Sequence, residues 1–265
     1  MNSFRLTVLL LLLSIPNPIF SQQNLNSQFT VVVDAGHGGK DPGNTGNGYL
    51  EKKIALSIAL KLGKKLENNG VKVVYTRKSD VFVNLFERAN IANRSNAQLF
   101  ISIHCDSHTS QAYGAGTFVL GLHANQRNFE IAKKENSVIF FEEDYINQYE
   151  GFDPNNPESV IGLTLMQEEY LDQSIVAASY IQNSFVDKLK RRNRTVKQAG
   201  FIVLKYTYMP SVLVETGFLT NNSEGAYLNS LKGQNEMADA IASAVIDYKN
   251  DFFQNLSTTN LNDDL

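Results

Sequence analysis

The stretch FTVVVDAGHGGKDPG, residues 29–43, joins an apolar run to a histidine that is surrounded by glycines. Its first half, FTVVVDA, is short and rich in β-branched residues, which predicts a strand buried on both faces. The glycines on either side of His37 allow the backbone to turn sharply and to come close to a ligand. Neither G-x-x-x-x-G-K-[ST] nor G-x-G-x-x-G is present, which argues against a nucleotide loop. We therefore expect His37 at the end of a buried strand, in a ligand site.

Outward from this stretch, short β-type runs alternate with helical patterns. Further strands are expected at 71–76, 99–104, 116–121, 200–205 and 211–216, and helices at 50–70, 83–96, 171–189 and around 237–252. Apolar strands that alternate with helices are typical of a mostly parallel sheet covered on both faces. The sequence therefore predicts one α/β domain, with a mostly parallel or mixed β-sheet of about six strands flanked by helices on both faces.

The amino terminus has the pattern of a secretory signal. Arg5 precedes an apolar run, 6–15, that is broken by Pro16. This run is too short to cross a bilayer, which takes about 20 residues. The order of charge, apolar run and small residue predicts a signal peptide over 1–21, cleaved after Ser21. No membrane span is expected after cleavage.

The remaining chain is expected to form one domain and a tail. The domain should cover 28–252, and a segment within it at 122–173, which fits the alternation least well, should be an insertion. Residues 253–265 are polar and should form a frayed tail.

Composition narrows the class of protein. An apolar fraction of 43% supports a sizeable core, and a net charge of −3 argues against a nucleic-acid binder. Cys105 is the single cysteine, so an internal disulfide is excluded. Because its side chain should point away from that of His104 on the same strand, we expect Cys105 to be a buried, small apolar residue.

Four residues are expected to meet at one edge of the sheet. His37, His104 and Glu215 follow or close predicted strands, and ligands bind beyond the carboxyl ends of parallel strands. Glu51 stands in the first helical turn and continues the apolar stripe of that helix. A buried charge there is costly unless it is paired or bound to a cation. The alternative is an acid that only favours the helix N-terminus.

These residue types point to metal chemistry. Two imidazoles and a carboxylate, from His37, His104 and Glu51, form the open ligand set of a catalytic zinc ion. Glu215 would then be the carboxylate that takes a proton from water.

The sequence gives weaker evidence for a functional role of the other histidines and of the basic cluster. His108 should be solvated in a loop, whereas His123 follows a strand and could face the cleft. The basic cluster at 188–194 is interpreted as a solvated helix end, with contact to an anionic surface as the alternative.

The motifs together resemble the zinc-dependent N-acetylmuramoyl-L-alanine amidases of bacterial cell-wall turnover. The resemblance rests on VVVDAGHGGKDPGNTG, the glutamate of GYLEKKIALSIALKLGKKLE, VVYTRKSDVFVNLFERANIAN, LFISIHCDSH, GAGTFVL and FIVLKYTYMPSVLVETGFLTN. It implies Zn²⁺ ligands at His37, Glu51 and His104 and a catalytic glutamate at Glu215. It also implies cleavage of the amide between the lactyl group of N-acetylmuramic acid and the L-alanine of the stem peptide. Because peptidoglycan lies outside the cytoplasmic membrane, the protein should be exported and be periplasmic, extracellular or cell-wall associated.

The insertion carries a regulatory hypothesis that also comes from the resemblance. In some division amidases an inserted helix blocks the zinc ion with its own glutamate until a partner displaces it. Segment 122–173 lies in the matching gap, and its acids considered for this role are Glu142, Glu143, Glu150, Glu158, Glu168 and Glu169. Autoinhibition relieved by an activator protein is one interpretation, and the alternative is a groove wall or a plain surface loop.

Two rival functions remain. A zinc peptidase could cut within the stem peptide, and a wall-binding protein could keep the fold without turnover. A pure binder would have no need of Glu215, which speaks against the second rival.

Overall fold

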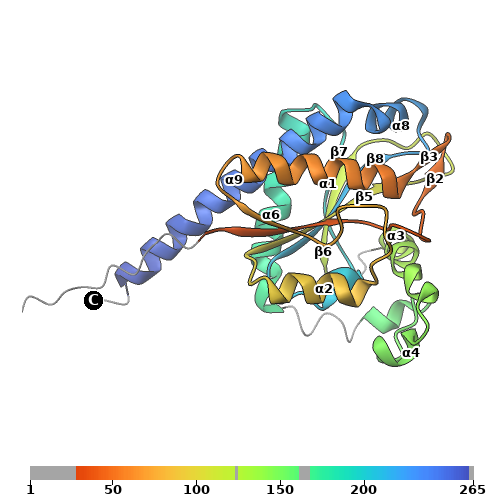
Figure 1. Cartoon of the computed structure of the whole chain (residues 1–265), viewed down its shortest axis with the longest axis horizontal. Coiled ribbons are helices and arrows are strands. Elements are labelled where there is room, and N and C mark those ends of the chain that lie inside the picture. Colours follow the sequence, from red (N-terminus) through yellow and green to blue (C-terminus); the bar gives the residue numbers. More distant parts are fainter. Residues whose placement is uncertain (1–27, 123–124, 161–167, 263–265) are drawn as a thin grey trace, which may run out of the picture.

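The computed structural model describes residues 28–122, 125–160 and 168–262, which form a layered α/β domain built on one six-stranded sheet (Figure 1). The strands are β1 (Thr30–Ala35), β4 (Lys72–Tyr75), β5 (Leu99–Asp106), β6 (Ala115–Leu120), β7 (Asn193–Ala199) and β8 (Ser211–Phe218), in the order β4-β1-β5-β8-β6-β7. β6 runs antiparallel to β8, and every other neighbouring pair is parallel. A short hairpin of β2 (Thr45–Gly46) and β3 (Tyr49–Leu50) lies apart from this sheet. The prediction of a mixed sheet of about six strands is therefore confirmed.

Helices cover both faces of the sheet. They are α1 (Glu51–Glu67), α2 (Leu85–Arg94), α3 (Gln126–Asn136), α4 (Tyr145–Gln148), α6 (Glu168–Asp187), α7 (Ile202–Lys205), α8 (Asn222–Asn229) and α9 (Leu231–Asn262), with 3-10 turns at Ser137–Phe141 and Pro157–Val160. α1, α6 and α9 pack on one face, and α2 and α7 pack on the other (Figure 1).

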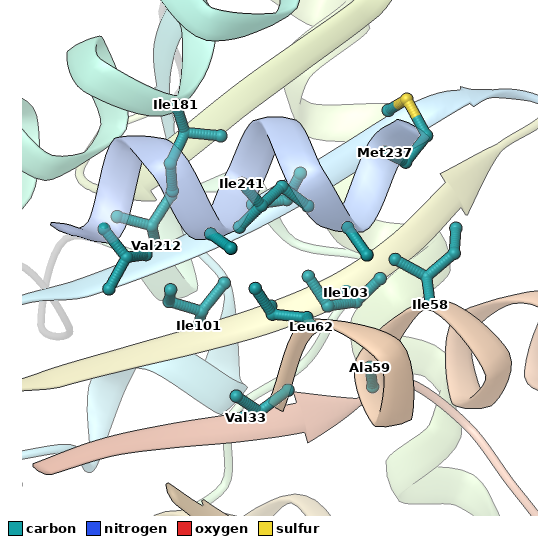
Figure 2. Packing of buried hydrophobic residues seen from close by; sticks show 14 of the residues in the cluster. Val33, Ile58, Ala59, Leu62, Ile101, Ile103, Ile181, Val212, Met237 and Ile241 are labelled. Atoms are coloured by element: carbon teal, nitrogen blue, oxygen red, sulfur yellow. The ribbon is translucent and has the colours of Figure 1, made fainter. Parts of the chain in front are cut away.

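Alternation along the central strands fills both layers of the core. In β1, Val31 and Val33 belong to the apolar cluster under α1, α6 and α9, whereas Val32 belongs to the cluster under α2 and α7. Figure 2 shows the first cluster, where Leu62 of α1 and Ile241 of α9 lie over the strands. Because both faces of these strands are packed in the core, the strand ends are held in place. Side chains at those ends therefore have fixed positions.

The edge strand β7 lies before the position that the sequence predicts for it. Residues 200–205 were expected to form a strand, but the structure has a short helix, α7, there, and the strand is the preceding segment, β7. β7 is an edge strand with polar side chains, so it lacks the apolar run that marks a buried strand. The apolar side chains of α7 are instead buried beneath the sheet, which explains the misleading pattern.

The carboxyl-terminal helix also runs further than expected. α9 continues to Asn262, through most of the segment predicted to be a frayed polar tail, 253–265. The segment contains neither glycine nor proline, so nothing in its sequence stops the helix. No helix in the described ranges is long and apolar enough to span a bilayer. The predicted signal peptide, 1–21, lies outside the described residues.

Candidate metal centre

Four buried side chains converge beyond the carboxyl ends of β1 and β5. They are His37, Glu51, His104 and Glu135, and one potential ligand atom from each lies within 4.8 Å of the others. His37 follows β1, His104 lies near the end of β5, and Glu51 is the first residue of α1. Glu135 comes from the last turn of α3, in the inserted segment. The structure thus brings together three of the four residues singled out in the sequence and adds a carboxylate.

The contacts within this cluster are close. Nε2 of His37 lies 3.2 Å from Oε1 of Glu51 and 3.0 Å from Oε2 of Glu135. Nδ1 of His104 lies 3.0 Å from each of the same two oxygen atoms and 3.2 Å from Nε2 of His37. Each imidazole therefore presents one specific nitrogen to a common point, Nε2 from His37 and Nδ1 from His104.

The backbone at His37 is held in an uncommon conformation. Its φ of 60° lies in the left-handed region, which is rare for a residue other than glycine. Nδ1 of His37 contacts Oδ2 of Asp41 at 2.7 Å, which fixes the ring. A Cβ atom on Gly36 would lie 2.5 Å from the His104 ring, so the glycine permits the close approach of the β1 backbone to the second histidine.

Two buried arginines hold this loop. Arg88 of α2 donates from Nη2 to the carbonyl oxygen of His37 at 2.7 Å, and its Nη1 forms an ion pair with Asp34 at 2.7 Å. Arg77 donates to the carbonyl oxygens of Ala35 and Gly36 at 2.9 and 2.7 Å. The guanidinium groups therefore fix the turn that aims His37 at the cluster.

Glu51 is fully buried, and both of its carboxylate oxygens accept hydrogen bonds. Oε1 accepts from the backbone N–H of Cys105 at 2.8 Å, and Oε2 accepts from that of Asn44 at 2.7 Å. Burial alone would raise the pKa of Glu51, but the two histidines hold that pKa well below its usual value. Glu51 is thus a built-in anion of the cluster, and favourable placement at a helix N-terminus is not sufficient to explain it.

The two carboxylates raise the pKa values of both histidines. Burial disfavours the imidazolium form, but Glu135 and Glu51 outweigh it and raise the pKa of His104 to about 10. The pKa of His37 is raised for the same reason, despite burial, by Glu51 and Glu135. The site therefore favours positive charge at its centre, which either protons or a cation can supply.

Glu215 lies beside the cluster on the neighbouring strand β8, in register with His104 of β5. It is fully buried, and neither carboxylate oxygen has a hydrogen-bond partner in the described part of the chain. Burial, reinforced by the negative charges of Asp106, Glu135 and Glu51, raises the pKa of Glu215 well above its usual value. A buried carboxylate without partners is costly for stability and is typical of a group kept for chemistry.

The donor set fits a divalent metal ion. Imidazole and carboxylate groups suit zinc and other first-row transition metals. The convergence of two carboxylates and two imidazoles in a buried site also calls for a central cation. The residues present could therefore hold a metal ion, and they include the three predicted ligands, His37, Glu51 and His104, together with one extra carboxylate.

Comparison with known proteins places the chain in a family. The family model for N-acetylmuramoyl-L-alanine amidase matches residues 31–247. The chain belongs to the N-acetylmuramoyl-L-alanine amidase family. It is 35% identical over 223 residues to the amidase AmiA of Escherichia coli strain K12, covering 82% of this chain and 75% of AmiA. It is 32% identical to the amidase LytC of Bacillus subtilis strain 168, covering 83% of this chain and 35% of LytC.

Solved structures show the same fold. The amidase AmiC2 of Nostoc punctiforme superposes with a TM-score of 0.63 at 30% identity, over 84% of this amidase and 97% of AmiC2. An amidase of Clostridium difficile 630 gives a TM-score of 0.64 at 27% identity, over 84% and 97% of the two chains. The CwlD amidase of Clostridioides difficile, at 27% identity and a TM-score of 0.63, was solved in complex with the GerS lipoprotein. The resemblance seen in the sequence is confirmed, and this chain is an amidase that acts on the cell wall.

Glu135 is the site residue of the amidase that sequence reasoning missed. Segment 122–173 was expected to be an insertion that fits the alternation least well; it contains α3, which packs against the apolar cluster under α2 and α7 through Ile131 and Ala132. The signal was present: Glu135 lies on one buried helical stripe with Asn128, Ile131 and Ala132, just as Glu51 lies in line with the buried stripe of α1.

The acids of the insertion that were considered in the sequence lie elsewhere. Glu142 accepts a hydrogen bond from the hydroxyl of Tyr149 at 2.8 Å, and Glu150 pairs with Lys205 at 3.4 Å. Glu143, Glu158 and Glu169 are exposed. The side chain of Glu168 lies outside the described residues. None of the described ones belongs to the cluster.

The remaining sequence predictions have mixed outcomes. Cys105 is buried in the core and His108 is exposed, as expected. His123 lies outside the described residues. The basic cluster 188–194 is only partly a solvated helix end, because Arg191 pairs with Glu224 and Arg194 pairs with Asp106 at 2.7 Å.

Proposed function

We propose that this amidase is a zinc-dependent peptidoglycan hydrolase that cleaves the amide between the lactyl group of N-acetylmuramic acid and the L-alanine of the stem peptide. His37, Glu51 and His104 would hold the zinc ion, and Glu215 would act as general base and acid. The observation that carries the proposal is the convergence of these three ligands beside Glu215, the buried carboxylate that has no partner in the described chain. The family supplies the substrate class.

The chemistry asked of each group follows from its surroundings. A zinc ion bound there would polarise the amide carbonyl and lower the pKa of a water molecule toward neutrality. Glu215 accepts the proton of the attacking water and passes it to the departing amine. Its raised pKa suits the first of these tasks, because a carboxylate with a raised pKa is a stronger proton acceptor.

We also propose that the structure represents a closed state in which Glu135 covers the site. Oε2 of Glu135 lies 3.0 Å from both imidazole nitrogens that face the cluster, which is where a fourth, exchangeable ligand of zinc would be needed. α3 is held by the packing of Ile131 and Ala132 on the core and by hydrogen bonds of the Asn136 side chain to the backbone of Gly200 and Ile202. A partner would have to replace these few contacts to move the helix. An activator protein that binds the inserted segment would withdraw Glu135 and admit the substrate.

We also propose that the protein is exported. The charged, apolar and small-residue pattern of 1–21 supports a cleaved secretory signal and a periplasmic or cell-wall location. The cell-wall function of the relatives is consistent with this location.

The test is digestion of purified sacculi followed by mass spectrometry. We expect whole stem peptides that begin with L-alanine to be released by the wild-type protein with zinc, and none by Glu215→Gln. Shortened peptides would indicate a peptidase instead. A protein that binds sacculi and releases nothing, even after Glu135→Gln opens the site, would indicate a wall-binding module.

A further inference from the structure

A second buried carboxylate reaches His104 through a serine. Oγ of Ser102, two residues before His104 on β5, lies 2.6 Å from Oδ2 of Asp34 and 3.1 Å from Nε2 of His104. Ser102 and Asp34 are fully buried, and Asp34 lies on the adjacent strand β1. The three side chains form one chain of contacts that ends at the imidazole nitrogen facing away from the cluster.

The direction of each hydrogen bond in this chain follows from Asp34. Arg88 pairs with Asp34 at 2.7 Å, and both groups are at most 1% exposed, so Asp34 carries a negative charge. A carboxylate can only accept hydrogen bonds, so the Ser102 hydroxyl donates its single proton to Asp34. Its lone pairs are then available to accept from His104, which requires a proton on Nε2 of that ring.

We propose that Ser102 and Asp34 are positioning residues that keep the proton of His104 on Nε2, so that Nδ1 is the nitrogen offered to the metal. This inference rests on the proposed function of His104 as a ligand. His37 presents the other ring nitrogen, because Asp41 contacts its Nδ1 directly and leaves Nε2 to face the cluster. The two ligands thus use different nitrogens, and each has its own carboxylate to select it. Outer partners of this kind set the orientation and basicity of metal-binding histidines.

Arg88 connects the two halves of this arrangement. The same guanidinium pairs with Asp34 and donates to the carbonyl oxygens of Ala35 and His37, both at 2.7 Å. It therefore stabilises the charge that orients His104 and the loop that carries His37.

The chain provides a matched control. Thr76 donates to Asp34 at the other carboxylate oxygen, Oδ1, at 2.5 Å, but makes no hydrogen bond to His104. Thr76→Val removes a buried hydroxyl from Asp34 as Ser102→Ala does, and it leaves the contact with His104 intact. Ser102→Thr keeps the hydroxyl and serves as the conservative variant.

The experiment measures Zn²⁺ affinity of the full chain by competition with a chelator, for the wild type and the three variants. We expect Ser102→Ala to weaken Zn²⁺ binding by about 10- to 100-fold, the usual effect of losing an outer partner of a metal ligand. Thr76→Val should remain close to the wild type, and Ser102→Thr should restore most of the loss. Equal affinities for Ser102→Ala and Thr76→Val would overturn the proposal.

A second readout needs no metal and separates this inference from the proposed function. In the metal-free wild type labelled with ¹⁵N-histidine, the Nε2 proton of His104 should exchange slowly with water because Ser102 accepts it. Ser102→Ala should speed this exchange, and Thr76→Val should not. An unchanged signal in Ser102→Ala overturns the role of Ser102 whether or not the protein binds Zn²⁺.

Discussion

His104 and Glu215 occupy paired positions on the adjacent parallel strands β5 and β8, yet only His104 enters the four-residue cluster. The backbones are locked together there, because the hydroxyl of Thr216 donates to the carbonyl oxygen of His104 at 2.8 Å. A candidate ligand and a candidate proton acceptor are thus held side by side by the sheet itself. Metal binding and proton transfer are therefore assigned to different residues, so the two roles can be tested separately.

Glu215→Gln and His37→Ala should divide these two roles. Glu215→Gln is expected to retain zinc but to lose about 10²- to 10⁴-fold in activity, the usual contribution of a general base. His37→Ala should lose zinc as well, because one of three ligands is removed. Metal analysis of both purified variants, with circular dichroism to confirm folding, checks the division. Loss of zinc from Glu215→Gln would place Glu215 among the ligands.

Removal of the Glu135 carboxylate should activate the enzyme. We expect Glu135→Gln to release stem peptides faster than the wild type without any activator, because the group that covers both imidazoles is weakened. Glu130→Gln is the matched control, since Glu130 lies on the same helix, is exposed, and contacts Gln126 instead. Initial rates on purified sacculi give the comparison. A well-folded Glu135→Gln variant that is no faster than Glu130→Gln would contradict the closed-state proposal.

Glu215 should also make stability depend on pH in the metal-free protein. Its pKa in the folded protein is raised above the ordinary value of 4.5, so the folded state holds the proton more tightly than the unfolded state does. Stability is therefore lost as the pH rises above 4.5 toward the raised folded value. Glu215→Gln cannot ionise and escapes this loss. Near pH 4 the two proteins should have similar stabilities.

The measurement is denaturant unfolding of both proteins in chelator at pH 4 and pH 7. At pH 7 we expect Glu215→Gln to be the more stable protein, because the variant does not carry the cost of ionising a buried carboxyl group. Because the variant is expected to be inactive, this would be a case of stability given up for function. A variant that is less stable than the wild type at pH 7 would refute the predicted shift.

The buried ion pair between Arg88 and Asp34 should be sensitive to loss of one partner. Arg88→Met leaves Asp34 as an uncompensated charge in the core, and we expect it to reduce the free energy of unfolding by about 3–5 kcal/mol. Arg94→Gln, on the same helix, breaks an exposed pair with Glu87 and should cost less than about 1 kcal/mol. Urea unfolding curves compare the two. If the double variant with Asp34→Asn is no more stable than Arg88→Met alone, the stranded charge is not the cause.

The sequence alone was enough to predict the layers of the fold and which three residues, His37, Glu51 and His104, meet in the candidate site. Apolar runs of β-branched residues at the positions of β1, β5 and β8 predict buried strands, and the polar residues that follow them must share one edge. Glu51 was found because a charged residue in the first helical turn lies in line with the apolar stripe of that helix. These signals are local in the chain, so they do not depend on how distant segments pack.

Only the tertiary structure decided what lies over that edge. Glu135 is 31 residues beyond His104 in the chain, within a segment whose pattern did not predict a helix, and its approach depends on how α3 packs. The edge strand β7 and the roles of Ser102 and Asp34 were likewise hidden. A polar edge strand has no apolar run to mark it, and the hydrogen bonds of Ser102 and Asp34 depend on the register between β1 and β5. Local sequence determines which residues are buried and at which strand ends, whereas long-range packing determines which of them meet.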